Sequence, residues 1–430
     1  MFKNLVNAFK TKEVRVKILL TLLLLLVYRI GCYLPIPGLQ AGALISTVES
    51  NTFLGLLNSI SGESLSNGAL LALGVSPYIS ASIIIQLLSI AIPSWQRLSK
   101  EGEEGRKKMA RYTRIAALVL SIAQAVGIVV GFSNIIDTHA LWNGAPTWLI
   151  STFVAIALVA GGMFTVWLGE RISDIGIGNG LSLLIFVGIL STMGSSLFNG
   201  ISNVAENLNN LWNILISLAL VLVIFFLIVF VDLAERRVPV QYAKQIKGRK
   251  MYGGQSTNIP IRVNASGVMP IIFASALLTF PQLIMSIFWP NSDAMQWYNA
   301  NMGAGSWPYI VLTALLILFF SYFYSQITFN PDDISKQIQQ NGGFIHGIRP
   351  GKQTADHLRK ISNRVILFGA IFLAFIALVP NLVLKAVSGD SSLISGFSAT
   401  SLLIVVSVAL EFDKQLEAQL LMRNYRGFLK

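Results

Sequence analysis

The residue types that catalyse reactions or bind metals are sparse in this 430-residue chain and form no known motif. The three histidines, His139, His346 and His357, are widely spaced and match no metal-ligand pattern. Cys32 is the single cysteine, so neither an internal disulfide nor a thiolate cluster can form. The sequence contains no G-x-S-x-G, Walker or H-E-x-x-H motif. We therefore predict no catalytic residue, no metal site and no cofactor.

One glycine-rich stretch, G-I-G-N-G at 176–180, is a candidate ligand-binding loop. A dinucleotide-binding loop requires G-x-G-x-x-G, but position 181 is a leucine and no soluble strand precedes the stretch. The glycines instead predict a tight turn that leads into a helix.

The composition indicates a membrane protein, because 54% of the residues are hydrophobic and only 12% are charged. A soluble chain carries roughly 25% charged residues. The apolar residues form separate runs, each close to the roughly 20 residues that cross a bilayer. The first run is long and lacks a small-residue cleavage site, so we expect a retained span rather than a signal peptide. Ten transmembrane helices are predicted, at about 18–34, 73–92, 115–133, 148–168, 181–198, 212–231, 266–288, 308–329, 365–384 and 393–410.

The basic residues predict the orientation of these spans. All but two of the 32 Lys and Arg residues fall on one side, in the termini and in alternate loops. Lys385 falls on the other side, and Arg29 lies inside the first span. Because basic loops are retained in the cytoplasm, we expect both termini to be cytoplasmic. The net charge of +12 is thus mostly a matter of topology.

Arg29 is the one ionisable group within the predicted spans, and its place near a helix end favours a side chain that snorkels to the interface. Ion-coupled transporters carry carboxylates, Lys or His in their spans, and intramembrane enzymes need paired catalytic groups there. A secondary transporter of small solutes is therefore the weaker alternative. Spans without charge suit an apolar constriction that holds back water by dewetting and does not trap a polypeptide.

Apolar residues at helical spacing are candidates for such a constriction. Val75 and Ile79 lie four residues apart in the second span, and Ile272, Ala276 and Phe280 form a stripe on the seventh. Helix packing or lipid contact produces the same stripes, so the spacing leaves both interpretations open.

Three segments are neither spans nor short loops. Residues 36–72 contain a Ser-, Gly- and Asn-rich stretch with one apolar side, which fits either a surface loop or a short helix folded back into the protein. The loops at 232–265 and 330–364 mix basic residues with glycine and proline turn signals. Loops of this length are usually functional or disordered. We expect them to dock an acidic or phosphate-bearing partner, the alternative being solvated loops.

Five long motifs resemble the SecY family, the central subunit of the bacterial protein-translocation channel. The motifs follow the order of the family and span nearly the whole chain: ALGVSPYISASIIIQLL (72–88), GERISDIGIGNGLSLLIF (169–186), NIPIRVNASGVMPIIFASALL (258–278), GIRPGKQTA (347–355) and TSLLIV (400–405).

The resemblance implies two inverted, pseudo-symmetric halves of five helices each. Because five spans per half is an odd number, two related halves would be inverted relative to each other. The cytosolic N-terminal segment would cover 1–17, the N-terminal half 18–200, the C-terminal half 201–410, and the cytosolic tail 411–430.

The resemblance also implies the functional residues. A plug helix at about 54–66 would include Leu57, Asn58, Ile60, Ser61 and Gly62. A pore ring would consist of Val75, Ile79, Ile185, Ile272, Ala276 and Ile404, of which Val75 and Ala276 depart from the isoleucine of the best-known members. The lateral gate between the second and seventh spans would carry Ser80, Gln86, Phe280 and, on the adjacent third span, Gln124.

The implied partners are the small membrane subunits SecE and SecG, the motor ATPase SecA, and the ribosome with its RNA. Arg349 in G-I-R-P-G, with Lys247, Arg249 and Lys250, would dock the motor or the ribosome. Signal sequences and nascent polypeptides would enter the channel, and membrane spans would leave sideways into the lipid bilayer. The expected location is the plasma membrane.

Overall fold

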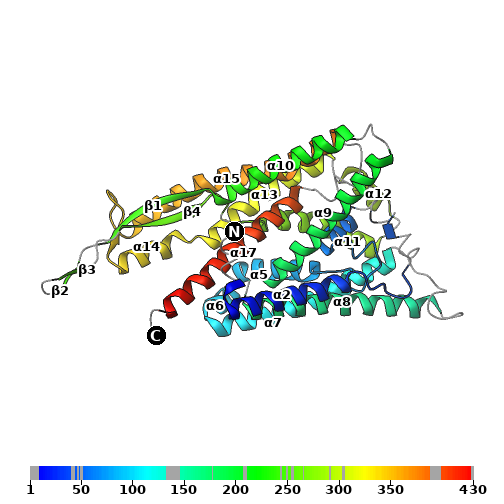
Figure 1. Cartoon of the computed structure of the whole chain (residues 1–430), viewed down its shortest axis with the longest axis horizontal. Coiled ribbons are helices and arrows are strands. Elements are labelled where there is room, and N and C mark those ends of the chain that lie inside the picture. The colour runs from blue at the N-terminus through cyan, green and yellow to red at the C-terminus, as the bar shows by residue number, and fades with distance from the viewer. Residues whose placement is uncertain are drawn as a thin grey trace.

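The computed structural model describes residues 9–39, 44–45, 48, 52–131, 146–176, 178–206, 211–242, 245–247, 250–252, 256–264, 266–289, 292–302, 306–387 and 399–427. These residues are mostly helical, with a few short strands at one end of the molecule (Figure 1).

The described part of the first half consists of helices joined by turns, with one isolated antiparallel bridge between Pro35 and Ala69. Its helices are α2 (Lys12–Gly31), α4 (Thr52–Ser61), α5 (Ser76–Ala91), α6 (Pro93–Lys100), α7 (Glu103–Gly131), α8 (Thr147–Ile175) and α9 (Gly180–Glu206). The predicted glycine turn before the fifth span is confirmed, because Gly176 and Gly178 have φ of 85° and 83° and α9 begins at Gly180.

The second half adds helices and the strands. The helices are α10 (Leu211–Leu233), α11 (Met269–Phe288), α12 (Asp293–Asn301), α13 (Trp307–Thr328), α14 (Pro331–Gln340), α15 (Lys352–Val387) and α17 (Ala399–Gly427). The strands are β1 (Glu235–Tyr242), β2 (Gln245–Lys247), β3 (Lys250–Tyr252), β4 (Ser256–Arg262) and β5 (Gly343–Phe344).

The predicted spans correspond to α2, α5, α7, α8, α9, α10, α11, α13, α15 and α17. Among the described residues, six segments are long and apolar enough to cross a bilayer by length and composition, in α7, α8, α9, α10, α13 and α15. The shorter α5 and α11 are also apolar. In α2 the charged first turns dilute the apolar run, and residues 393–398 of the predicted tenth span lie outside the described residues.

The helices form two groups joined along a central seam (Figure 1). Helices α2 and α7 pack on α8 in one group, while α10 and α13 pack on α15 in the other. Helix α17 runs between the groups and packs on α9, α10 and α15, and α11 packs on α7 across the seam. The large buried contact area therefore lies in the middle of the molecule.

The long loops 232–265 and 330–364 fold together into one unit, which we call the sheet unit: β1, β4 and β5 with α14 and the first turns of α15. Strand β1 pairs antiparallel with both β4 and β5, so the second loop contributes a strand to a sheet of the first. The unit has its own core of Val238, Val240, Ile261, Ile338, Ile345 and Leu358. It projects from the end of the molecule where the C-terminus also lies (Figure 1).

Candidate functional site

All six residues predicted for the pore ring belong to one apolar cluster at the seam, here called the central cluster. Val75, Ile185 and Ile404 are buried in it, with 0%, 7% and 7% of their surface exposed. Ile79, Ile272 and Ala276 are partly buried and pack against it. Residues from α5, α9, α11 and α17 thus meet at one place, although they are up to 329 positions apart in the numbering from 75 to 404.

Local geometry explains why α5 and α11 each present two of these residues. Val75 is the N-cap of α5, and the amide of Ile79 donates to its carbonyl at 3.0 Å, so the two side chains lie one turn apart. Ile272 and Ala276 have the same spacing on α11. Ala276 contributes a single methyl group, so it fills less of the seam than any other member.

Helix α4 decides between the two interpretations of residues 36–72. Leu54 is fully buried and Leu57 is 4% exposed, so the fold-back helix is confirmed and the surface loop is not. The helix covers Thr52–Ser61, two residues earlier than the predicted start, and 62–66 form turns. The Asn58 side chain accepts from the Ser66 amide at 2.9 Å and holds these turns against the helix end.

Two apolar clusters hold α4. Leu54 and Leu57 belong to a second cluster with Ile128 of α7 and Val154 of α8. Ile60 packs against the central cluster. The predicted plug segment therefore packs against the cluster that includes the residues predicted for the pore ring, and α4 contacts α5, α9 and α11.

Arg29, which we expect to snorkel to the interface, forms hydrogen bonds within the protein. Its Nη1 donates to the Gly62 carbonyl at 2.8 Å, and its Nη2 donates to the Tyr33 hydroxyl at 2.8 Å and to the Ser191 hydroxyl. The guanidinium also lies 4.7 Å from the centre of the Tyr33 ring. One of these partners is the backbone carbonyl just past the end of α4, which a sequence pattern could not reveal.

The predicted gate residues lie on three helices that meet at the seam. Helix α7 packs against both α5 and α11. On α7, Gln124 is 5% exposed, and its side-chain oxygen is buried without a hydrogen-bond partner. On α5, Ser80 is partly buried and Gln86 donates to the Ser82 hydroxyl at 3.2 Å. Phe280 lies within α11.

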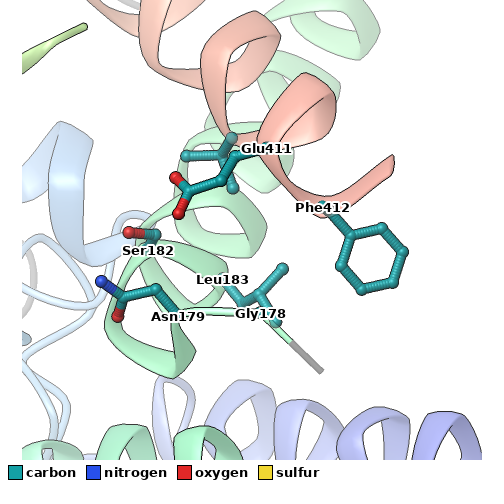
Figure 2. Close-up of a pocket in the computed structure, with 7 residues that line it drawn as sticks. Gly178, Asn179, Ser182, Leu183, Glu411 and Phe412 are labelled. Atoms are coloured by element: carbon teal, nitrogen blue, oxygen red, sulfur yellow. The ribbon is translucent and has the colours of Figure 1, made fainter. Parts of the chain in front are cut away.

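A small half-open pocket lies beside the central cluster, between the start of α9 and α17 (Figure 2). Its lining combines the turn residues Gly178 and Asn179 with Ser182 and Leu183 of α9 and Glu411 of α17. Figure 2 shows the Glu411 carboxylate extending toward Ser182, and Phe412 pointing away. The pocket gives a polar rim to the same two helices that carry Ile185 and Ile404.

Arg349 occupies an exposed turn of the sheet unit, between β5 and α15. Its carbonyl accepts from the Thr354 hydroxyl at 2.9 Å, and the Gly351 carbonyl accepts from the Ser335 hydroxyl of α14 at 2.7 Å. Gly347 and Gly351 have φ of 77° and 99°, which glycine adopts without strain. The turn is therefore fixed at both ends while the guanidinium remains exposed.

The other predicted docking residues lie in the β2–β3 hairpin. Lys247 and Lys250 are paired residues of its two strands. Arg249 lies outside the described residues. Within the described residues, no group of three or more His, Cys, Asp or Glu side chains is placed to hold a metal ion.

The comparison with protein families matches SecY over residues 69–412. The protein translocase subunit SecY of Halalkalibacterium halodurans is 40% identical over the full length of both chains. The SecY subunits of Mycobacterium tuberculosis and Streptomyces coelicolor are 40% and 41% identical, again over the full length of both chains.

Solved channels share the fold. One described as a protein-conducting channel has a TM-score of 0.65 at 19% identity, with 93% of this chain and 90% of that chain covered. Another, in which the SecY plug domain is described as stabilising the closed state, has a TM-score of 0.64. Sec61 from a canine ribosome–channel complex has a TM-score of 0.62 at 17% identity, over 93% and 90% of the two chains.

Proposed function

The chain belongs to the SecY family of protein-translocation channels, and we propose that its central cluster and α4 together form the closed seal of that channel. The observation that carries this proposal is the contact of Ile60 with the cluster that contains all six pore-ring positions. One apolar surface then serves as the pore lining and as the seat of the plug.

The seal works by excluding water. Val75, Ile185 and Ile404 offer no hydrogen-bond partner to water or ions, so a narrow passage between them dewets when no polypeptide fills it. A chain in transit replaces helix–helix contacts with contacts to its own side chains and meets no fixed charge. The driving force must come from a partner, because the chain brings no catalytic group of its own.

The lateral exit lies where α11 packs on α7 next to α5. The buried oxygen of Gln124 on α7 lacks a hydrogen-bond partner, which carries a desolvation cost of about 1–3 kcal/mol. An apolar signal sequence would separate α11 from α7 at this exit. Ser80, Gln86 and Phe280 line the same opening.

The sheet unit docks the partners. We assign it to the cytoplasm, together with both termini, in a protein of the plasma membrane. Arg349 makes a charge-assisted contact with a carboxylate or phosphate of the motor ATPase SecA or of the ribosome, and Lys247, Arg249 and Lys250 add to the basic surface. Resemblance to relatives found in ribosome complexes supports this assignment. SecE and SecG are the proposed membrane partners.

The test is transport by the purified protein. Vesicles containing this chain with SecE and SecG, supplied with SecA and ATP, are expected to protect a secretory precursor from added protease. A precursor without its signal sequence serves as the control and should stay accessible. Equal protection of both precursors, or of neither, would contradict the proposal.

A further inference from the structure

The C-terminal end of α4 is closed by its own turn, in which the Glu63 amide donates to the Asn58 carbonyl at 2.9 Å, and also by neighbouring helices. The last carbonyls of a helix lack partners within the helix and carry partial negative charge. Here the Ser61 carbonyl accepts from the Tyr28 hydroxyl at 3.5 Å and from the Cys32 thiol at 3.7 Å. The Gly62 carbonyl accepts from Arg29 at 2.8 Å. Three neighbouring side chains at the C-terminal end of α2 therefore close the end of the plug.

Helix α9 holds the same end from the other side. Ser191, Thr192 and Ser195 share one face of α9, at spacings of one turn. Ser191 accepts from Arg29, Thr192 contacts the Ser59 carbonyl at 3.5 Å, and Ser195 donates to the Glu63 carboxylate. Arg29 of α2 and Glu63, just past the end of α4, thus bind successive turns of α9.

The backbone confirms that this end is fitted to its seat. Gly62 has φ of 69°, and a Cβ there would lie 2.8 Å from the Gly188 Cα, so only glycine fits between α2 and α9. Glu63 has φ of 67°, an uncommon conformation for a residue with a side chain. Such a conformation persists where surrounding contacts hold it, and the Ser195 hydrogen bond is one of them.

We infer that Arg29 is the positioning residue of the plug, and that its bond to the Gly62 carbonyl sets how readily the channel opens. The inference rests on the proposed function of α4 as the plug. Arg29 suits this task because its planar fork bonds the plug with one nitrogen and α9 and Tyr33 with the other, which a lysine cannot do. When α4 leaves, Arg29 retains Tyr33 and Ser191. Release breaks its bond to Gly62, together with the bonds that Tyr28, Cys32, Thr192 and Ser195 make to this end, and needs no reordering of α2.

The direct test measures where the plug is. Cysteines placed at Ser59 and Thr192, whose contact joins α4 to α9, should form a disulfide readily in the otherwise unchanged chain. Adding Arg29→Gln should lower the rate of disulfide formation at least about tenfold, which corresponds to about 1.4 kcal/mol in the seating equilibrium. Arg15→Gln is the matched control, because Arg15 is exposed on the same helix.

A second measurement separates positioning from folding. In planar bilayers, the ion leak of Arg29→Gln should exceed that of the unchanged protein, with Arg29→Lys between the two. Export of a precursor with a weakened signal sequence should increase rather than fall, which a misfolded channel would not show. Unchanged crosslinking and leak in Arg29→Gln would overturn the role of Arg29. Absence of precursor transport by the unchanged protein would instead count against the proposed function, and the crosslinking result would still stand.

Discussion

Arg349 shows how a single charge is made available to a partner. Hydrogen bonds from Thr354 and Ser335 fix the backbone of its turn, so docking need not order it. We expect Arg349→Glu to reduce motor-driven export in vesicles at least about tenfold, because charge-assisted hydrogen bonds contribute about 1.5–3 kcal/mol and the reversed charge repels the partner. Protease protection of the precursor measures this effect.

Lys336→Glu is the control for this prediction. Lys336 is exposed on α14 of the same sheet unit, so the substitution changes the net charge equally without altering the turn. Export should remain close to normal. An equal loss in both variants would show that the overall basic charge, and not the turn, docks the partner.

Ala276 and Ile404 differ in how much of the seam they fill. Ile404 is 7% exposed in the central cluster, so Ile404→Ala removes buried methyl groups at a cost of about 2–5 kcal/mol. We expect a several-fold higher ion leak through the resting channel in planar bilayers, while Ala276→Gly should change the leak little.

The compensating variant sharpens this comparison. Adding Ala276→Ile to Ile404→Ala restores bulk at a neighbouring place in the same cluster, and it should return the leak toward that of the unchanged protein. If the ion leak of Ala276→Gly alone equals that of Ile404→Ala, the seal depends on Ala276, and the prediction that Ile404 contributes more to the seal is wrong.

At the scale of elements, the apolar runs and glycines of the sequence were sufficient to predict the helices, but they did not predict the contacts between the helices. The turn before α9 follows from glycines that adopt positive φ. The apolar side of residues 36–72 fitted either a surface loop or a fold-back helix, and the burial of Leu54 and Leu57 decided between them. The hydrogen-bond partners of Arg29 could not be predicted from the sequence, because backbone carbonyls and serine hydroxyls produce no charge pattern.

None of the strands was predicted from the sequence. The alternation of Val238 and Val240 on β1 is short, and Pro239 lies between them, so the segment does not resemble a strand. Its sheet forms because β4 and β5 supply partners, and β5 comes from a loop about 100 residues later. The small core under the sheet also joins residues that are far apart in the sequence, including Ile338 and Leu358.

The separation of α11 from α5 and α7 is the testable event at the scale of elements. Cysteines at Ser80 and Phe280, joined by a short bifunctional thiol reagent, should prevent a signal sequence from inserting and should abolish export. Two cysteines at Ser80 and Ser82, both on α5, provide a control that the reagent links without joining helices. Normal export by fully crosslinked protein would contradict a gate at this position.

At the scale of the whole molecule, two of the basic loops predicted to share one side, 232–265 and 330–364, meet in the sheet unit, at the end where the C-terminus of α17 also lies (Figure 1). The tail of α17 packs Leu416 against Val14 and Ile18 of α2. Contacts of this kind join the first and last spans, and no periodicity within either helix predicts them.

The apolar side chains of the central cluster separate a polypeptide channel from a transporter of small solutes. A transporter moves its substrate with no protein partner and ordinarily needs an ionisable group near the middle of a span, whereas Arg29 here bonds the end of α4.

We therefore expect vesicles with the purified chain to retain entrapped glutamate, potassium ions and a neutral sugar as well as empty vesicles do. A precursor arrested in transit by a folded C-terminal domain should release potassium, because it displaces α4 and holds the central cluster open. Steady, saturable uptake of one solute by the resting protein would favour the transporter, and a tight membrane around an arrested precursor would show that α4 is not the seal.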